Sequence, residues 1–133
     1  MTPIATAFAV LQASIASPIE GQWANPGGSV VVAIAPCGEA FCGTVVSASD
    51  KANADARKGG VNELVGTELL SGFVAAGNGQ WKGRLFVPDL KKRTRAQLRQ
   101  LSSDKLRISG CTVGGIICKS QIWTRIVSPA AGD

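Results

Sequence analysis

The sequence predicts an all-β protein, built as a single antiparallel up-and-down barrel of about eight strands. Short apolar stretches rich in β-branched residues recur every eight to fifteen residues and alternate with turn signals. No long helical period of apolar residues appears after residue 20. A chain of 133 residues suits one domain, and closing an antiparallel sheet of this length into a barrel removes its exposed edges.

The first half of the chain contains four of the expected strands. They are expected at residues 19–24, 29–35, 41–47 and 67–75. The turn Asn25-Pro26-Gly27-Gly28 separates the first two strands, and residues 36–40 close a hairpin into the third. Residues 50–60 are polar and rich in alanine, so we expect a surface loop there with room for one helical turn.

The second half contains the other four strands. They are expected at residues 80–87, 93–101, 105–110 and 121–127. Asn78-Gly79 predicts a tight hairpin, because a type I′ turn needs a positive φ at both central residues. The barrel domain is therefore expected over residues 17–128, with a frayed tail at residues 129–133. Eight strands enclose an interior that side chains nearly fill or that holds one small ligand.

Residues 1–16 have the pattern of a secretory signal peptide. No ionisable side chain precedes Glu20, residues 4–11 form an apolar run, and Ser14 and Ala16 supply the small residues that a signal peptidase reads. No Lys or Arg precedes the run, so an amphipathic N-terminal helix is the alternative. The segment is too short to span a bilayer, which takes about 20 apolar residues. We expect a periplasmic or secreted protein without a transmembrane span.

The four cysteines fall into two pairs that are close in sequence. Cys37 and Cys42 form one pair and Cys111 and Cys118 the other, and neither pair has the C-x-x-C spacing of a zinc or thioredoxin-type site. Of three possible connectivities we favour these local pairs as disulfides, since a hairpin can close each loop. An all-cysteine zinc cage is the alternative.

The composition excludes several kinds of chemistry. The chain has no His and no Tyr, so a histidine base, a histidine metal ligand or a tyrosine acid is impossible. Its carboxylates form no tight sequence pair, and no Ser-x-x-Lys, Gly-x-Ser-x-Gly or phosphate-binding glycine loop occurs. We expect no catalytic residues, no metal and no cofactor.

A basic run at residues 91–99 carries five of the fourteen positive charges. If Ala96 and Leu98 face inward, strand alternation places Arg93, Arg95 and Arg99 on an outward ladder. Such a ladder could meet anionic lipid or an acidic protein partner. Nucleic acid is not expected, because no aromatic residues interleave with the charges. The alternative is a solvated edge strand whose charges prevent aggregation.

Three aromatic residues are candidates for the mouth of a ligand site. They are Trp81, Phe86 and Trp123. For the two tryptophans the alternative is plain core packing, which buries a large area.

Five short motifs occur in order along the chain. They are Pro36-Cys37-Gly38-x-x-x-Cys42-Gly43, Gly79-x-Trp81-x-Gly83, Pro88-Asp89, Leu106-x-Ile108-x-Gly110-Cys111 and Gln121-x-Trp123-Thr124-Arg125. This set, over about residues 19–127, resembles the bacterial domain-of-unknown-function 2147 family. The resemblance implies an exported, lipocalin-like β-barrel and no known activity. Relatives usually carry tyrosines where this chain has Phe86-Val87 and residues 92–95, so no ligand preference that depends on those hydroxyls is carried over.

A second resemblance concerns the ends of the barrel. Lipocalins open with Gly-x-Trp, as in Gly21-Gln22-Trp23, and their indole packs at the closed end beneath an Arg of the last strand. Arg125 stands where that partner would be, and a stacked pair would gain about 0.5–2 kcal/mol. The alternative is that Trp23 is plain core and Arg125 is plainly exposed.

These patterns predict an exported small β-barrel that binds a small apolar or amphipathic ligand such as a lipid. The alternative is an inhibitor-like module for a protein partner or the envelope surface, which would use the arginine ladder and the disulfide-closed hairpins. An internal cavity open at one end would favour the first function, and a solid core would favour the second. An enzyme would need buried carboxylates gathered around a cleft.

Overall fold

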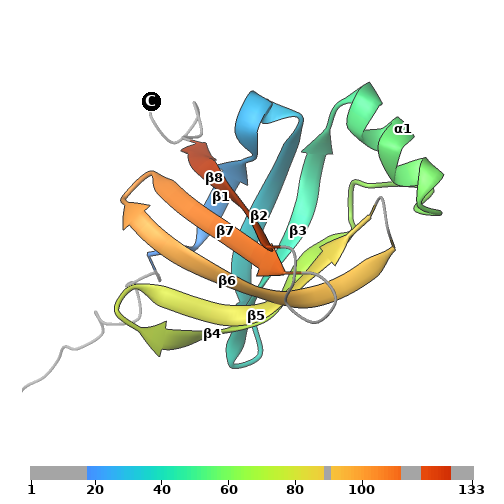
Figure 1. Cartoon of the computed structure of the whole chain (residues 1–133). Coiled ribbons are helices and arrows are strands. Elements are labelled where there is room, and N and C mark those ends of the chain that lie inside the picture. Colours follow the sequence, from blue (N-terminus) through green and yellow to red (C-terminus); the bar gives the residue numbers. More distant parts are fainter. Residues whose placement is uncertain (1–17, 89–90, 112–117, 127–133) are drawn as a thin grey trace, which may run out of the picture.

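The structure is a computed structural model that describes residues 18–88, 91–111 and 118–126 (Figure 1). The chain passes through eight described strands, with the helix α1 (Asp50–Lys58) between the third and fourth and a short 3₁₀ turn, η2 (Pro26–Gly28), after the first. The strands are β1 (Gly21–Ala24), β2 (Val30–Cys37), β3 (Ala40–Ala48), β4 (Glu68–Gly77), β5 (Gln80–Val87), β6 (Lys92–Ser102), β7 (Lys105–Cys111) and β8 (Cys118–Ile126). The predicted signal-like segment and frayed tail lie outside the described residues.

Within the described residues, the eight strands form one closed antiparallel barrel in sequence order, as predicted. Each strand pairs with the next, and the ring closes where β1 pairs with β8. In that last pair Trp23 lies opposite Arg125, and Ala24 lies opposite Thr124. Because the strands run up and down, the turns alternate between two ends: β2–β3, β4–β5 and β6–β7 meet at one, and the other four connections meet at the other.

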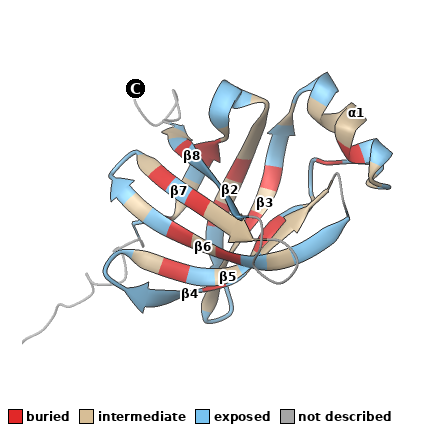
Figure 2. Cartoon of the chain, in the orientation of Figure 1, coloured by how far each residue is buried: buried red, intermediate tan, exposed pale blue. Residues whose placement is uncertain are grey.

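The core consists mainly of the inward residues of the strands, joined by Ile19, Ala56 and Leu64 from outside them. Figure 2 shows buried residues at every second position in the middle of β6 and β7, which is the period of two that a half-buried strand requires. The largest fully buried side chains are Trp23, Phe73, Ile19, Leu70, Leu98, Leu106, Val32 and Val45. Gly83 makes room for one of them, since a Cβ at this position would lie 2.7 Å from the ring of Phe73.

The tight turns and the disulfides follow the sequence prediction. Asn78 and Gly79 both adopt positive φ, 54° and 70°, as the predicted type I′ hairpin requires. Disulfides join Cys37 to Cys42 across β2 and β3, and Cys111 to Cys118 across β7 and β8. The two bridges therefore lie at opposite ends of the barrel.

The prediction of a surface loop at residues 50–60 was wrong, because residues 50–58 form the helix α1. Ser49 caps α1 by accepting a hydrogen bond from the Ala52 amide at 3.1 Å, and the amide of Gly59 bonds the carbonyl of Ala56 at the other end. Alanine-rich sequence favours the helix in between. Ala56 and the following Leu64 are 1% and 4% exposed, so tertiary packing holds this short helix against the barrel.

The alternative of an edge strand for the basic run is also wrong. β6 lies between two strands: it pairs with β5 over residues 92–99 and with β7 over residues 96–102. The described barrel is closed, so β6 is not an edge strand. The arginines of β6 need a different explanation from protection of an edge.

Candidate functional site

A cavity of about 600 Å³ opens at the end of the barrel where α1 lies. Its lining comes from the β1–β2 connection, from α1 and the residues after it, and from the parts of the strands near this end. This volume falls within the range of about 300–1,000 Å³ that is usual for small-molecule pockets. The cavity is therefore large enough for one small organic ligand.

The deeper wall of the cavity is apolar. Ile108 of β7 and Trp123 of β8 point inward from the barrel, and they are 4% and 5% exposed. Leu64 and Leu69 contribute from the segment that follows α1. The other apolar lining residues are Val30, Ala52, Leu85, Phe86, Val87 and Pro88. An apolar molecule would bury its surface here without leaving polar groups unpaired.

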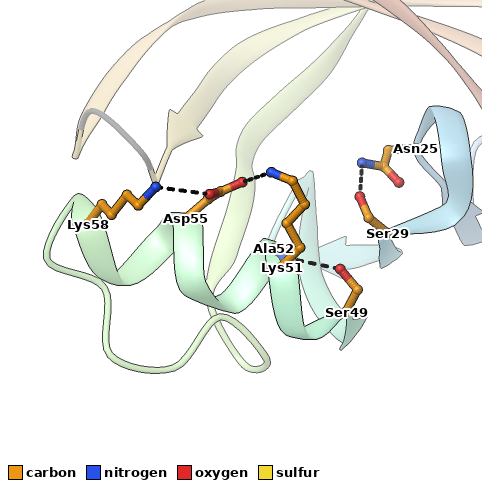
Figure 3. Close-up of polar contacts among 7 residues, drawn as sticks. All are labelled: Asn25, Ser29, Ser49, Lys51, Ala52, Asp55 and Lys58. Atoms are coloured by element: carbon orange, nitrogen blue, oxygen red, sulfur yellow. Dashed lines mark hydrogen bonds and ion pairs between the residues drawn. The ribbon is translucent and has the colours of Figure 1, made fainter.

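The polar part of the lining includes two pairs that are satisfied within the protein. Lys51 and Asp55 of α1 form an ion pair at 3.1 Å, and Figure 3 shows them in a row with Lys58, which lies 3.8 Å from the same carboxylate. The hydrogen bond from Lys51 is the main reason why the pKa of Asp55 lies below its ordinary value. On β1–β2, the Asn25 amide donates to the Ser29 hydroxyl at 3.0 Å (Figure 3).

Lys119 differs from these groups, because it lines the cavity and forms no ion pair among the described residues. It precedes Gln121 and Trp123 on the inward face of β8, and it is exposed. The Gln121 side chain accepts a hydrogen bond from the Trp123 indole at 2.9 Å, which fixes the ring in the wall. A cation at the rim above an apolar pocket suits a ligand with one polar end.

The opposite end of the barrel is closed by Trp23 and Arg125. The Arg125 guanidinium lies 4.3 Å from the centre of the fully buried Trp23 ring. The indole donates to the carbonyl of Ile19 at 3.0 Å, so its one polar atom is also satisfied. Gly21 adjoins the pair with φ +136°, and a Cβ here would lie 2.6 Å from Arg125 Nη1.

Arg125 also ties three backbone segments together. Its nitrogens donate to the carbonyls of Pro18 at 2.6 Å, Glu20 at 2.8 Å and Ser103 at 2.8 Å. These acceptors belong to the segment before β1 and to the β6–β7 turn. The planar fork of donors in arginine matches three fixed acceptors in a way that a lysine ammonium does not. The arrangement closes the end of the described barrel opposite α1.

Two of the three aromatic residues that were predicted at the mouth line the cavity, and the third does not. Trp123 and Phe86 both line the cavity. Trp81 does not line it: this residue is 7% exposed and belongs to the hydrophobic core, opposite Leu98. The assignment of Trp81 to the mouth was wrong because Trp81 starts β5 at the closed end, where the β4–β5 turn lies.

The arginine ladder lies on the outside of the barrel. Ala96 and Leu98 are 7% and 0% exposed, while Arg93, Arg95 and Arg99 are all exposed. Arg93 covers the ring of Phe86 at 5.2 Å from the ring centre, so the ladder meets the cavity wall at this point. The sequence alternation therefore gave the correct faces for β6.

Sequence reasoning missed several lining residues. Lys119 could have been found, because it shares the period-two face of Gln121 and Trp123 once β8 is extended to its start. Leu64 carried no usable signal, since it lies in the connection between α1 and β4, whereas Leu69 belongs to β4, within the strand expected at residues 67–75. Among the described residues, no group of three or more metal-ligating side chains gathers.

A family model described as "Uncharacterized protein conserved in bacteria (DUF2147)" matches residues 21–125. The chain belongs to this family. The DUF2147 match runs from Gly21 in the first strand to Arg125 in the last strand, and these two strands pair to close the barrel. The resemblance in the sequence implied this family. No curated protein matches the chain.

The fold of this DUF2147 member is similar to that of a solved structure described as "Protein HP1028 from the human pathogen Helicobacter pylori belongs to the lipocalin family". The TM-score is 0.65, the sequences are 15% identical, and the match covers 86% of each chain. At this identity the likeness concerns the fold alone, which is lipocalin-like. No described helix is long and apolar enough to cross a membrane.

Proposed function

We propose that this protein is an exported binding protein that takes one small apolar or amphipathic molecule into the mouth of its barrel. The observation that carries the proposal is the apolar cavity of about 600 Å³ at the α1 end, opposite the Trp23–Arg125 closure. The lipocalin-like fold supports it, since barrels of eight strands have room for one small ligand. The proposed role is binding without a reaction.

Export is the part of the proposal that rests on the sequence and the cysteines together. All four cysteines lie in the two disulfides. Such bridges persist in oxidising compartments and are rare in the bacterial cytosol. Together with the signal-like pattern of residues 1–16, they support a periplasmic or secreted location.

The ligand proposal can be tested with N-phenyl-1-naphthylamine, a neutral apolar probe that fluoresces on leaving water. We expect saturable binding, with energy transfer from Trp123, which lines the cavity. The substitution Gly110→Leu should fill the cavity, because a Cβ there meets its neighbours at an ordinary 3.5 Å or more and Gly110 belongs to the lining. We expect this variant to bind the probe at least about tenfold more weakly, which corresponds to a loss of about 1.4 kcal/mol of binding free energy.

Ser109→Leu is the matched control, because this neighbouring residue lies on the other face of β7 and is absent from the cavity lining. It adds the same side chain and should leave probe binding unchanged. Thermal unfolding of both variants would verify the fold. Absence of saturable binding by the parent protein, or full binding by Gly110→Leu, would reject the proposed function.

A further inference from the structure

The charges of this barrel are divided between its two halves. The described strands β1–β4 contain no Lys or Arg and one acidic residue, Glu68. The strands β5–β8 contain ten cations and no Asp or Glu. These cations are Lys82, Arg84, Lys92, Arg93, Arg95, Arg99, Lys105, Arg107, Lys119 and Arg125. The net charge of +5 therefore arises on one side of the molecule.

Four of these cations form a compact cluster on the outside, which we call the cationic face: Arg84, Arg95, Arg99 and Arg107. All four are exposed. Arg84 lies directly opposite Arg95 across β5 and β6, and Arg99 lies directly opposite Arg107 across β6 and β7. Opposed residues are about 5 Å apart in a sheet, and Arg95 and Arg99 are about 13 Å apart along their strand.

The cationic face has no counterpart within the described protein. The ion pairs of the described residues are those that Asp55 makes in α1, so no carboxylate neutralises the face. Like charges directly opposite each other lower the stability of a sheet. Protection of a sheet edge does not account for them, because β6 lies between β5 and β7 in the closed barrel. An external anion would remove this repulsion.

The neighbouring side chains favour a lipid surface as that anion. Ile122 of β8 lies directly opposite Arg107 and is 42% exposed, and Ile126 on the same outer face is 38% exposed. Guanidinium groups form bidentate hydrogen bonds with phosphate. Exposed isoleucines beside them can insert into the membrane interface below the headgroups. None of the described aromatic side chains is exposed, so the face lacks the stacking residues with which single-stranded nucleic acid is bound.

We propose that the cationic face docks the protein onto a membrane surface rich in anionic phospholipid headgroups. The contact uses the outside of β5–β8 and is separate from the ligand cavity. An array of headgroups suits charges spread over three strands better than one small anion does. The attraction is electrostatic in origin, so it weakens as salt concentration rises.

The test is sedimentation with vesicles of phosphatidylcholine that contain one third phosphatidylglycerol, compared with phosphatidylcholine alone. The parent protein should bind only the anionic vesicles, and less at high salt. The double variant Arg95→Gln/Arg99→Gln should bind roughly 20-fold more weakly, since each basic residue at an anionic surface contributes about fivefold. It should remain folded, because it removes like-charge repulsion.

The matched control is Arg57→Gln/Lys58→Gln in α1, which lowers the net charge by the same two units away from the cationic face. It should bind within about twofold of the parent, since long-range charge is screened. A parent protein that ignores anionic vesicles would overturn the proposal. Equal losses in the two double variants would also overturn it, because binding would then follow net charge alone.

Two further measurements separate lipid from other polyanions. Ile122→Ser should bind anionic vesicles several-fold more weakly, because the apolar contact would be lost. Duplex DNA at an equal phosphate concentration should fail to displace the parent protein from vesicles. Unchanged vesicle binding by Ile122→Ser, or displacement by DNA, would assign the face to a soluble polyanion and reject the lipid surface.

Discussion

Arg125 shows how much of this fold one side chain can hold. It stacks on Trp23 and donates to three carbonyls, two in the segment before β1 and one in the β6–β7 turn. Charge-assisted hydrogen bonds and a cation–π contact are each among the stronger single interactions of a protein surface. We expect the closed end of the barrel to depend on this residue.

The substitution Arg125→Met should lower the free energy of unfolding by about 2–3 kcal/mol, because it removes the stacking and the three hydrogen bonds while keeping some apolar contact. Urea unfolding followed by tryptophan fluorescence would measure the change. Arg107→Met is the control, since Arg107 is exposed and pairs across from Arg99; it should shift stability by less than about 0.5 kcal/mol. Equal losses in both variants would contradict a closing role for Arg125.

The inward or outward face of a residue in a regular strand was predictable from the sequence. The end of the barrel at which that residue lies was not. Gly21, Trp23 and Arg125 were paired because a short motif and a position on the last strand suffice. Trp81 was assigned to the mouth because the sequence around a tryptophan in a strand does not show at which end of the barrel the residue lies. The end is set by the direction of the hairpin, which depends on all the strands before it.

The helix α1 is the element that the sequence represented least well. Its nine residues have no apolar stripe of the usual length, and the polar character of the segment led to the expectation of a surface loop. The structure shows that its stability comes from Ser49 at the start, from the Lys51–Asp55 pair and from packing of Ala56. The last of these depends on the barrel surface, which no local pattern contains.

The stability of α1 should fall in acid. The pKa of Asp55 is lowered in the folded protein, chiefly by the hydrogen bond from Lys51, so the folded state prefers the ionised carboxyl. Such a group stabilises the fold fully above its ordinary pKa, and this contribution is lost as the pH falls through the lowered folded pKa. The protection of the α1 amides from hydrogen exchange, measured relative to an unstructured peptide at the same pH, should therefore fall over that acid range.

The control for this effect is a pair of substitutions. Asp55→Asn should make the protection factors of the α1 amides insensitive to pH over that range, while Glu63→Gln, just beyond the helix, should leave their pH dependence as it is in the parent. If Asp55→Asn kept the full acid response, the change would come from another group.

At the level of the whole molecule, period-two patterning and turn signals were enough to predict the closed barrel. Apolar alternation fixes which face of a strand is inside, and turns such as Asn78-Gly79 fix the order of neighbours. The cavity was not predictable in its details, because its volume depends on how side chains from four connections meet at one end. The sequence allowed an open or a filled interior equally.

The two disulfides should stabilise the barrel independently. Each closes a loop of a few residues, which is worth about 2 kcal/mol in the loop-closure model. Cys37→Ser/Cys42→Ser and Cys111→Ser/Cys118→Ser should each lower the free energy of unfolding by about that amount, and their effects should add because the bridges lie at opposite ends. Urea unfolding would measure the losses.

The same variants should differ in ligand binding. Cys111 and Cys118 adjoin Gly110 and Lys119 of the cavity lining, whereas Cys37 and Cys42 lie at the closed end. Only the Cys111→Ser/Cys118→Ser variant should weaken binding of N-phenyl-1-naphthylamine. The variant without any cysteine, placed in a reductant, is the control and should show no further loss of stability. Equal probe binding by the two double variants would contradict this placement of the cavity.

The pairing of the first strand with the last has a consequence for how the protein is made. Arg125 reaches a carbonyl 105 residues earlier, so the ring cannot shut until nearly all of the barrel has left the ribosome. At synthesis rates of about 5–20 residues per second, β1 waits roughly 5–20 s for its second neighbour. Contacts of such long range also make folding slow. During that interval the barrel cannot close, and a chain whose fold is incomplete is the form that can pass through a narrow channel.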